Sequence, residues 1–219
     1  KNAFKPVTGN NLEFGVKKEW FNGKWISGIT AYTITKQNVL TPDPDQEHYA
    51  TNPNAQVQVG ETRTRGIEFD ITGQILPGLN ATLNYAYTEP KVTEDKVRFD
   101  PTNPDADPNR DSPKVGTYLT GTVKNIANGW LSYRFKKLGS SLNGLGISGG
   151  VQYQTGRFAG AGFSKPNFDD YIRFDAGASY QRGKLVFSGV VNNILDRTLY
   201  TQGTIPTTVT NTSFYTWIY

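Results

Sequence analysis

Apolar and polar residues alternate along most of this chain, which is the pattern of β-strands whose two faces meet different surroundings. The clearest run covers residues 79–88, where polar or small residues alternate with Leu79, Ala81, Leu83, Tyr85 and Tyr87. The same period predicts eight strands, over residues 12–20, 24–36, 57–75, 79–88, 114–135, 145–157, 172–180 and 185–193. A ninth segment, residues 213–219, carries the pattern less regularly.

The connections between these strands alternate in length. Short ones are expected near residues 22–23, 76–78, 137–144 and 181–184, and long ones near 37–56, 89–113, 158–169 and 197–212. Asn22-Gly23 predicts a two-residue type I′ hairpin turn, and Pro77-Gly78 predicts a second tight turn. Because every long connection would lie at one end, the pattern predicts an all-β, antiparallel transmembrane β-barrel segment with short periplasmic turns and long extracellular loops.

Strand length and side-chain type agree with a barrel wall. Crossing a bilayer at a tilt takes roughly 9–11 residues, close to the length of the predicted strands. We expect Ile67, Phe69 and Ile71 to face lipid, and the polar residues between them to face a wet lumen. Aromatic residues typical of a girdle at the membrane boundary flank the first short turn: Trp20, Phe21 and Trp25.

Composition argues against several classes of function. The 219 residues contain no Cys and a single histidine, His48, so thiolate chemistry is excluded and a self-contained His-based metal site or Ser-His-Asp triad is not expected. The net charge of +4 does not by itself argue for nucleic acid. No apolar run exceeds three residues, so no transmembrane helix is expected. We therefore expect neither an enzyme nor a resident cofactor or metal.

Several stretches resemble the C-terminal part of TonB-dependent outer-membrane receptors of the ferric-siderophore branch. They are residues 9–20 (GNNLEFGVKKEW), 59–69 (VGETRTRGIEF), 83–88 (LNYAYT), 171–180 (YIRFDAGASY) and 190–200 (VVNNILDRTLY). Residues 35–44 (TKQNVLTPDP) are similar to hydroxamate-type receptors.

The resemblance implies a Gram-negative outer-membrane receptor that binds a ferric siderophore and imports it with inner-membrane energy. Residues 1–219 would form about eight strands of a barrel of about 22. Eight strands cannot close such a barrel, so the plug, the earlier strands and the closing strand are expected to lie elsewhere in a longer chain. The expected partners are the siderophore, the TonB coupling protein acting through the plug, and outer-membrane lipid with its lipopolysaccharide.

A ferric siderophore is a compact chelate whose own oxygens hold the iron, so the protein is expected to contribute aromatic surfaces and hydrogen bonds. Candidate ligand contacts on the long-loop side are Tyr49, Phe158, Phe163, Tyr200, Phe214, Tyr215 and Trp217. Arg63 and Arg65 share the lipid-facing parity near that end and are candidates for binding lipopolysaccharide phosphates, because guanidinium presents a fork to phosphate oxygens.

Other functions remain open at this point. The same family includes receptors for cobalamin, haem and glycans, although His48 lies in no haem-receptor motif. An outer-membrane enzyme would need an activating histidine or paired acids at the rim, and only His48 is available. A soluble β-rich adhesin or carbohydrate-binding module would instead bury the apolar faces of the strands.

Overall fold

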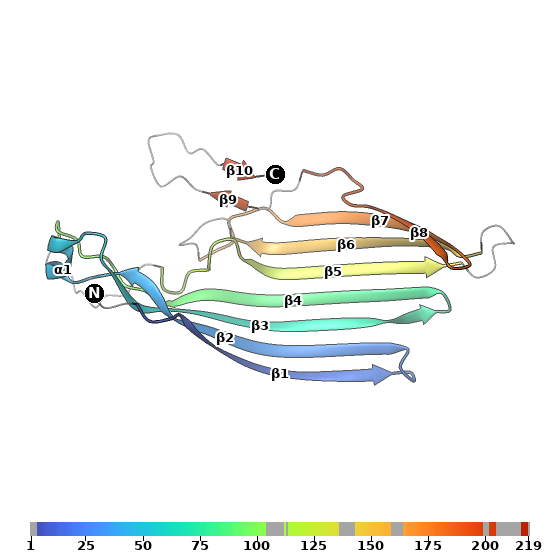
Figure 1. Cartoon of the computed structure of the whole chain (residues 1–219), viewed down its shortest axis with the longest axis horizontal. Helices are drawn as coiled ribbons and strands as arrows, with labels where there is room; N and C mark the ends of the chain where they lie inside the picture. Colours follow the sequence, from blue (N-terminus) through green and yellow to red (C-terminus); the bar gives the residue numbers. More distant parts are fainter. Residues whose placement is uncertain are drawn as a thin grey trace.

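The first eight strands pair antiparallel in chain order, each with its neighbour along the chain, which gives one eight-stranded sheet in the order β1 to β8 with β1 and β8 at its edges (Figure 1). The computed structural model describes residues 4–103, 112, 114–135, 143–158, 164–198, 202–204 and 216–218. The strands of the sheet are β1 (Thr8–Trp20), β2 (Trp25–Pro42), β3 (Gln56–Leu76), β4 (Leu79–Glu94), β5 (Val123–Arg134), β6 (Leu145–Arg157), β7 (Tyr171–Arg182) and β8 (Leu185–Val191).

The pairing register confirms the predicted apolar and polar faces. Ile29, Phe69 and Tyr85 lie directly opposite one another on β2, β3 and β4, so they share a face. Asp70 pairs with Asn84 one residue further along and therefore belongs to the other face. Directly opposed residues share a face because side chains alternate along a strand.

The apolar face is not covered by other parts of the described chain. Leu12 and Phe14 on β1 are 72% and 76% exposed. The buried apolar residues among the described ones are few: Ala81, Tyr118, Phe158 and Tyr171. A soluble sandwich would bury such a face against a second sheet, so this arrangement is that of a membrane barrel wall.

The first short turn differs from its prediction. Strand pairing continues to Trp20 and Trp25, which leaves a four-residue connection in place of a two-residue type I′ turn at Asn22-Gly23. Phe21, Asn22 and Gly23 all have left-handed φ values of 53°, 57° and 79°. At the second short turn the prediction is confirmed, because Leu76 pairs with Leu79 around Pro77-Gly78.

The predicted strand over residues 114–135 is wrong in its first part, because β5 begins at Val123. Residues 116–119 do run along the end of β4, where the Val92 amide donates to the Thr117 carbonyl at 3.0 Å. The chain then turns at Gly121, whose φ of 73° interrupts the strand. Such left-handed backbone is easily reached by glycine and does not belong to a regular strand.

Three smaller elements complete the described structure. The long connection between β2 and β3 contains a short helix, α1 (Gln46–Thr51). Near the end of the chain, β9 (Gln202–Thr204) pairs with β10 (Thr216–Ile218), so the doubtful ninth strand over 213–219 does not extend the main sheet. Among the described residues, no helix has the length and apolar character needed to span a membrane.

Candidate functional site

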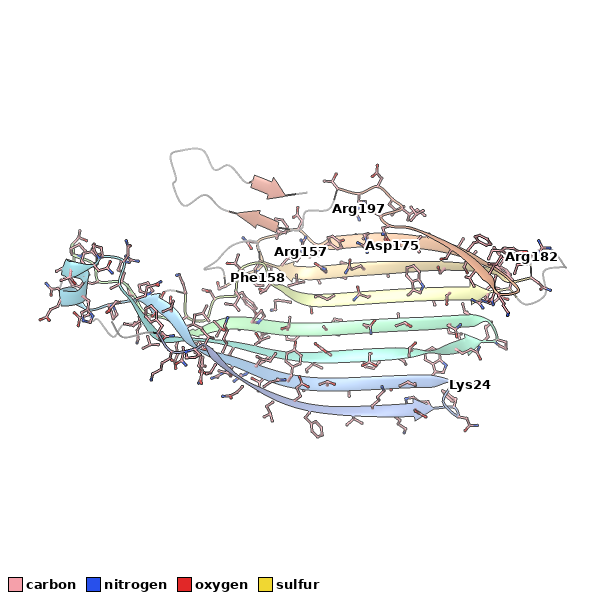
Figure 2. All side chains as sticks on the ribbon, viewed as in Figure 1. Lys24, Arg157, Phe158, Asp175, Arg182 and Arg197 are labelled. Carbon is pink, nitrogen blue, oxygen red and sulfur yellow. The ribbon has the colours of Figure 1, made fainter. Side chains whose placement is uncertain are left out.

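The long connections lie at one end of the sheet and the short turns at the other (Figure 1). Figure 2 shows Arg157 and Phe158 at the long-loop end, opposite Lys24 and Arg182 at the short-turn end. The described side chains of this end include those of three connections, residues 43–55, 95–122 and 158–170, of which 104–111, 113 and 159–163 lie outside the described residues. Their contacts decide which groups can face a ligand.

Tyr49, a predicted ligand contact, lies on α1 and packs against the next long connection. Its ring is 5.4 Å from that of Phe99, at an angle of 60°. Close by, the Arg98 guanidinium donates to the Pro53 carbonyl and to Asn54 Oδ1, the latter at 3.1 Å. Tyr49 thus connects two loops, and because it is only half-buried, part of the residue stays exposed.

A histidine–aspartate pair holds the α1 connection together. His48 Nδ1 lies 2.9 Å from Asp43 Oδ2, and Asp43 is buried while the His48 side chain is 64% exposed. The hydrogen bond to Asp43 is the main cause that raises the pKa of His48, followed by the negative charge of Asp45. Asp45 caps α1 through the amides of His48 and Glu47, and these bonds lower its own pKa.

The His48–Asp43 pair predicts that the local stability of residues 43–55 depends on pH. Because folding raises the pKa of His48, protonated His48 stabilises the folded loop. This stabilisation is fully present below the pKa that His48 has in the unfolded chain, and it is lost as the pH rises through the pKa that His48 has in the folded chain. After correction for intrinsic rates, we expect amide exchange in residues 43–55 to be faster at about pH 8.5 than at about pH 5.5. Hydrogen exchange on the full receptor measures this. His48→Gln should remove the difference, and an unchanged pH dependence in that variant would refute the assignment.

Phe158, another predicted ligand contact, is covered by its neighbours. It is 1% exposed and stacks on Tyr118, with ring centroids 4.0 Å apart and planes at 15°. Its amide donates to the Thr122 carbonyl at 2.9 Å. In this structure the Phe158 ring therefore supports the base of two loops and presents no surface to a ligand.

Arg157 anchors the connection between β6 and β7, and the sequence reasoning missed it. The guanidinium lies over the rings of Phe168 and Tyr171, at 4.6 and 5.5 Å from their centroids. It also donates to the Asp169 carbonyl at 2.8 Å, and the residue is 5% exposed. The available signal was an arginine at the end of an alternating strand, followed by a connection with aromatic residues at both ends.

The remaining predicted aromatic contacts stay predictions. Phe163, Tyr200, Phe214 and Tyr215 lie outside the described residues. Trp217 lies in β10, where its backbone pairs with Gly203. The structure thus brings Tyr49 and Phe158 to the long-loop end but does not bring them into contact with each other.

Arg63 and Arg65 lie on the same face of β3, as the sequence predicts, but in different surroundings. Arg63 Nη2 is 2.7 Å from Glu61 Oε1. Glu61 also accepts from Gln37 Nε2 at 3.1 Å and from Thr93 Oγ1 at 2.9 Å, so it ties β2, β3 and β4 together. Arg65 is exposed and forms no hydrogen bond or ion pair with another described residue.

The described residues form no cluster of metal ligands, but they do form a large apolar hollow. In the described ranges, no three His, Cys, Asp or Glu side chains come close enough together to hold a metal ion. A hollow of about 1040 Å³ over β4 to β7 is lined on the apolar face by residues such as Leu83, Leu131 and Val151. Because that face belongs to the membrane side, we do not assign the hollow to a water-borne ligand.

Known proteins share this architecture. The model of the family described as TonB dependent receptor-like, beta-barrel, matches residues 1–194. The metal-pseudopaline receptor CntO of Pseudomonas aeruginosa is 29% identical over 202 residues, which cover 90% of this chain and 25% of the relative. The ferric-pyoverdine M114 receptor PbuA of Pseudomonas sp. (strain M114) is 25% identical over 203 residues, covering 90% of this chain and 22% of the relative.

A solved structure gives the same fold. BauA, the ferric preacinetobactin receptor of Acinetobacter baumannii, superposes with a TM-score of 0.67 at 20% identity, covering 91% of this chain and 27% of that one. This chain therefore spans about a quarter of the length of the curated relatives named above.

Proposed function

Because this chain belongs to the TonB-dependent receptor β-barrel family, we propose that it is part of a receptor that binds a ferric siderophore and imports it. The observation that carries the proposal is the family match over residues 1–194, on a sheet whose long connections all lie at one end. Membership of this family also confirms the predicted location in the outer membrane of a Gram-negative bacterium.

The proposal assigns binding and no chemical step to the chain. The siderophore supplies the iron ligands, and the protein supplies aromatic and hydrogen-bonding contacts at the extracellular end. A hydroxamate-type chelate is our preferred ligand because of the similarity of residues 35–44. The rest of the barrel, about 22 strands in all, and a plug that receives energy from TonB belong to the proposed complete receptor.

A second candidate ligand is a metal chelate other than a ferric siderophore. The 29% identical relative is named a metal-pseudopaline receptor, which leaves the metal open. Ferric hydroxamate, ferric catecholate, a non-ferric metal chelate, haem and cobalamin should therefore be titrated in parallel against the full receptor. Tight binding of a ferric chelate alone supports the proposal, and tight binding of haem or cobalamin alone overturns it.

The ligand contacts are predicted on the late connections. In the full receptor, replacing Phe163, Tyr215 or Trp217 singly by Ala should weaken ferric-siderophore binding by roughly 1–3 kcal/mol, as truncation of a buried aromatic anchor does. Fluorescence quenching by the chelate measures the affinity. Unchanged affinity in all three variants, together with loss of binding on deleting residues 100–111, would place the site on the acidic loop instead.

A further inference from the structure

A row of polar side chains crosses the face of the sheet that is turned away from lipid. Asn84, Asn128 and Gln152 lie directly opposite one another on β4, β5 and β6, and Arg173 on β7 continues the row. Asn84 also pairs with Asp70 on β3, which belongs to the polar face. Because directly opposed residues share a face, the whole row faces the lumen of the barrel.

The row lies within the wall, at a distance from the long loops. Asn84 is the sixth residue of β4, roughly 17 Å along the strand from the short-turn end. Figure 2 shows Asp175, two residues after Arg173 on β7, between Arg157 at the long-loop end and Arg182 at the short-turn end. A ligand at this row has therefore left the loops and has not yet reached the short turns.

The three carboxamides of the row are available to a ligand. Within the described part of the chain, none of Asn84, Asn128 and Gln152 has a side-chain hydrogen bond. Asn84 is exposed, and the other two are half-buried. Each carboxamide carries one acceptor oxygen and two N–H donors. Three of them on adjacent strands can bond to a ligand that has both donors and acceptors.

Trp130 adds an aromatic surface beside the carboxamides, in the next row toward the short turns. It pairs with Thr82 on β4 and with Gly150 on β6. A Cβ at Gly150 would collide with the six-membered ring of the indole, so the ring covers this glycine. Trp130 is half-buried and lies on the polar face, where it cannot contact lipid. An indole combines a large apolar body with one N–H donor, which suits contact with a ligand in the lumen.

Trp130 also lines two hollows on the polar face. The first has a volume of about 160 Å³ and is lined by the three carboxamides together with Arg173 and Asp175. The second has a volume of about 360 Å³ and extends toward the short turns, where Ser132 and Arg134 line it. The two hollows thus follow each other along the wall in the direction of the periplasmic end.

The first hollow has no net charge. Arg173 and Asp175 are its charged lining residues, and they pair with Nη2 and Oδ2 3.0 Å apart. Asp175 Oδ1 also accepts from the Asn193 amide at 2.9 Å. Three singly charged hydroxamates balance one Fe³⁺, whereas three doubly charged catecholates leave the chelate anionic. An anionic chelate would meet a cation that is already paired, so this hollow suits an uncharged chelate better.

We propose that the first hollow is a second, transient binding site for the transported ferric chelate, inside the barrel, and that it selects an uncharged, hydroxamate-type chelate. Trp130 packs on the apolar surface of the chelate, and the carboxamides bond to its polar groups. The proposal rests on the proposed function, in which the chelate enters from the long-loop end. Because the chelate loses its loop contacts when it moves inward, contacts inside the barrel lower the free energy of that step.

The test uses the full receptor in cells, with radioactive iron in a ferric hydroxamate or a ferric catecholate. Binding is measured on cells without metabolic energy, and uptake on energised cells. Trp130→Ala removes the aromatic surface, and Asn128→Ala removes one carboxamide. The matched controls lie on the apolar face: Trp25→Ala, whose ring also covers a glycine, and Asn125→Ala on β5.

We expect Trp130→Ala and Asn128→Ala each to lower the uptake rate of the ferric hydroxamate about tenfold, the effect of losing one ligand anchor. Binding to cells without energy should stay unchanged, because it reports the loops. The two controls should take up the chelate as the parent receptor does. Heat-modifiable migration shows whether each variant is folded, and Asn128→Ala alone decides the test if Trp130→Ala does not assemble.

A fluorescent label distinguishes a ligand site from a contact with the plug. Gln154→Cys places the label on the polar face of β6, two residues beyond the row, and Tyr153→Cys places it on the opposite face as a control. Paramagnetic Fe³⁺ quenches a nearby fluorophore, whereas diamagnetic Ga³⁺ in the same chelate does not. We expect the ferric hydroxamate to quench the label at residue 154 during uptake more than the label at residue 153. Equal changes with the Fe³⁺ and Ga³⁺ chelates would show movement of the plug and overturn the ligand site.

Three other results would also overturn the inference. They are equal uptake by the parent receptor and both variants, a loss of binding to cells without energy that matches the loss of uptake, and ferric catecholate uptake that depends on Trp130 as strongly as hydroxamate uptake does. The last result refutes the selection of an uncharged chelate. A parent receptor that binds no ferric chelate refutes the proposed function and this inference with it. A parent receptor that imports the hydroxamate no faster than both variants refutes the inference alone.

Discussion

Replacing Phe69 by arginine is expected to destabilise the barrel by about 2–4 kcal/mol, the cost of a cation on the lipid face near the bilayer midplane. Phe69 lies between Ile29 and Tyr85 on the apolar face and is 40% exposed in the described chain, where lipid would cover it. Neither neighbour offers a carboxylate to the introduced charge.

Equilibrium unfolding of the full receptor in lipid vesicles, followed by tryptophan fluorescence, measures this cost. Asp70→Asn is the control, because Asp70 is the next residue on β3 and faces the polar side with Asn84. It should change the free energy of unfolding little. If Asp70→Asn proves more costly than Phe69→Arg, the facing assignment is wrong by one residue.

Replacing Arg157 by alanine is expected to loosen the β6–β7 connection and cost roughly 3 kcal/mol. The change removes two cation–π contacts and one charge-assisted hydrogen bond at a residue that is 5% exposed. It also leaves the rings of Phe168 and Tyr171 without the guanidinium that lies over each of them. Because Phe163 belongs to the same connection, ferric-siderophore binding should weaken as well.

Thermal unfolding and chelate binding of the full receptor test this second prediction. Arg157→Lys keeps the charge but not the planar fork, so it should recover only part of the loss. Arg134→Ala is the matched control on the partner strand β5, at the short-turn end, where Arg134 bonds to Gln181 Oε1 at 2.9 Å. An equal loss in Arg134→Ala and Arg157→Ala would contradict a specific role for Arg157.

The family resemblance read from the sequence is confirmed at the level of the receptor family. The hydroxamate-type ligand stays a proposal. By their names, the two curated relatives are receptors for ferric pyoverdine and for metal-pseudopaline. They are 25% and 29% identical to this chain over the aligned residues.

Most of the eight-stranded sheet was predictable from the sequence, although the start of β5 was not. Alternation is a local property of extended backbone, so the positions of Ile67, Phe69 and Ile71 were enough to predict their common face. The tight turn at Pro77-Gly78 was predictable for the same reason, since proline and glycine set the backbone locally. The unequal lengths of the connections then indicated which end carries the loops.

Contacts between loops were not predictable, because they join groups that are far apart along the chain. Phe158 was a candidate ligand contact from the sequence, yet its ring is stacked on Tyr118 from another connection. Arg63 and Arg65 look alike in the sequence, but only Arg63 meets Glu61 as its partner. Even the first hairpin followed the pairing of Trp20 with Trp25 instead of the local preference of Asn-Gly, since register is fixed by whole strands.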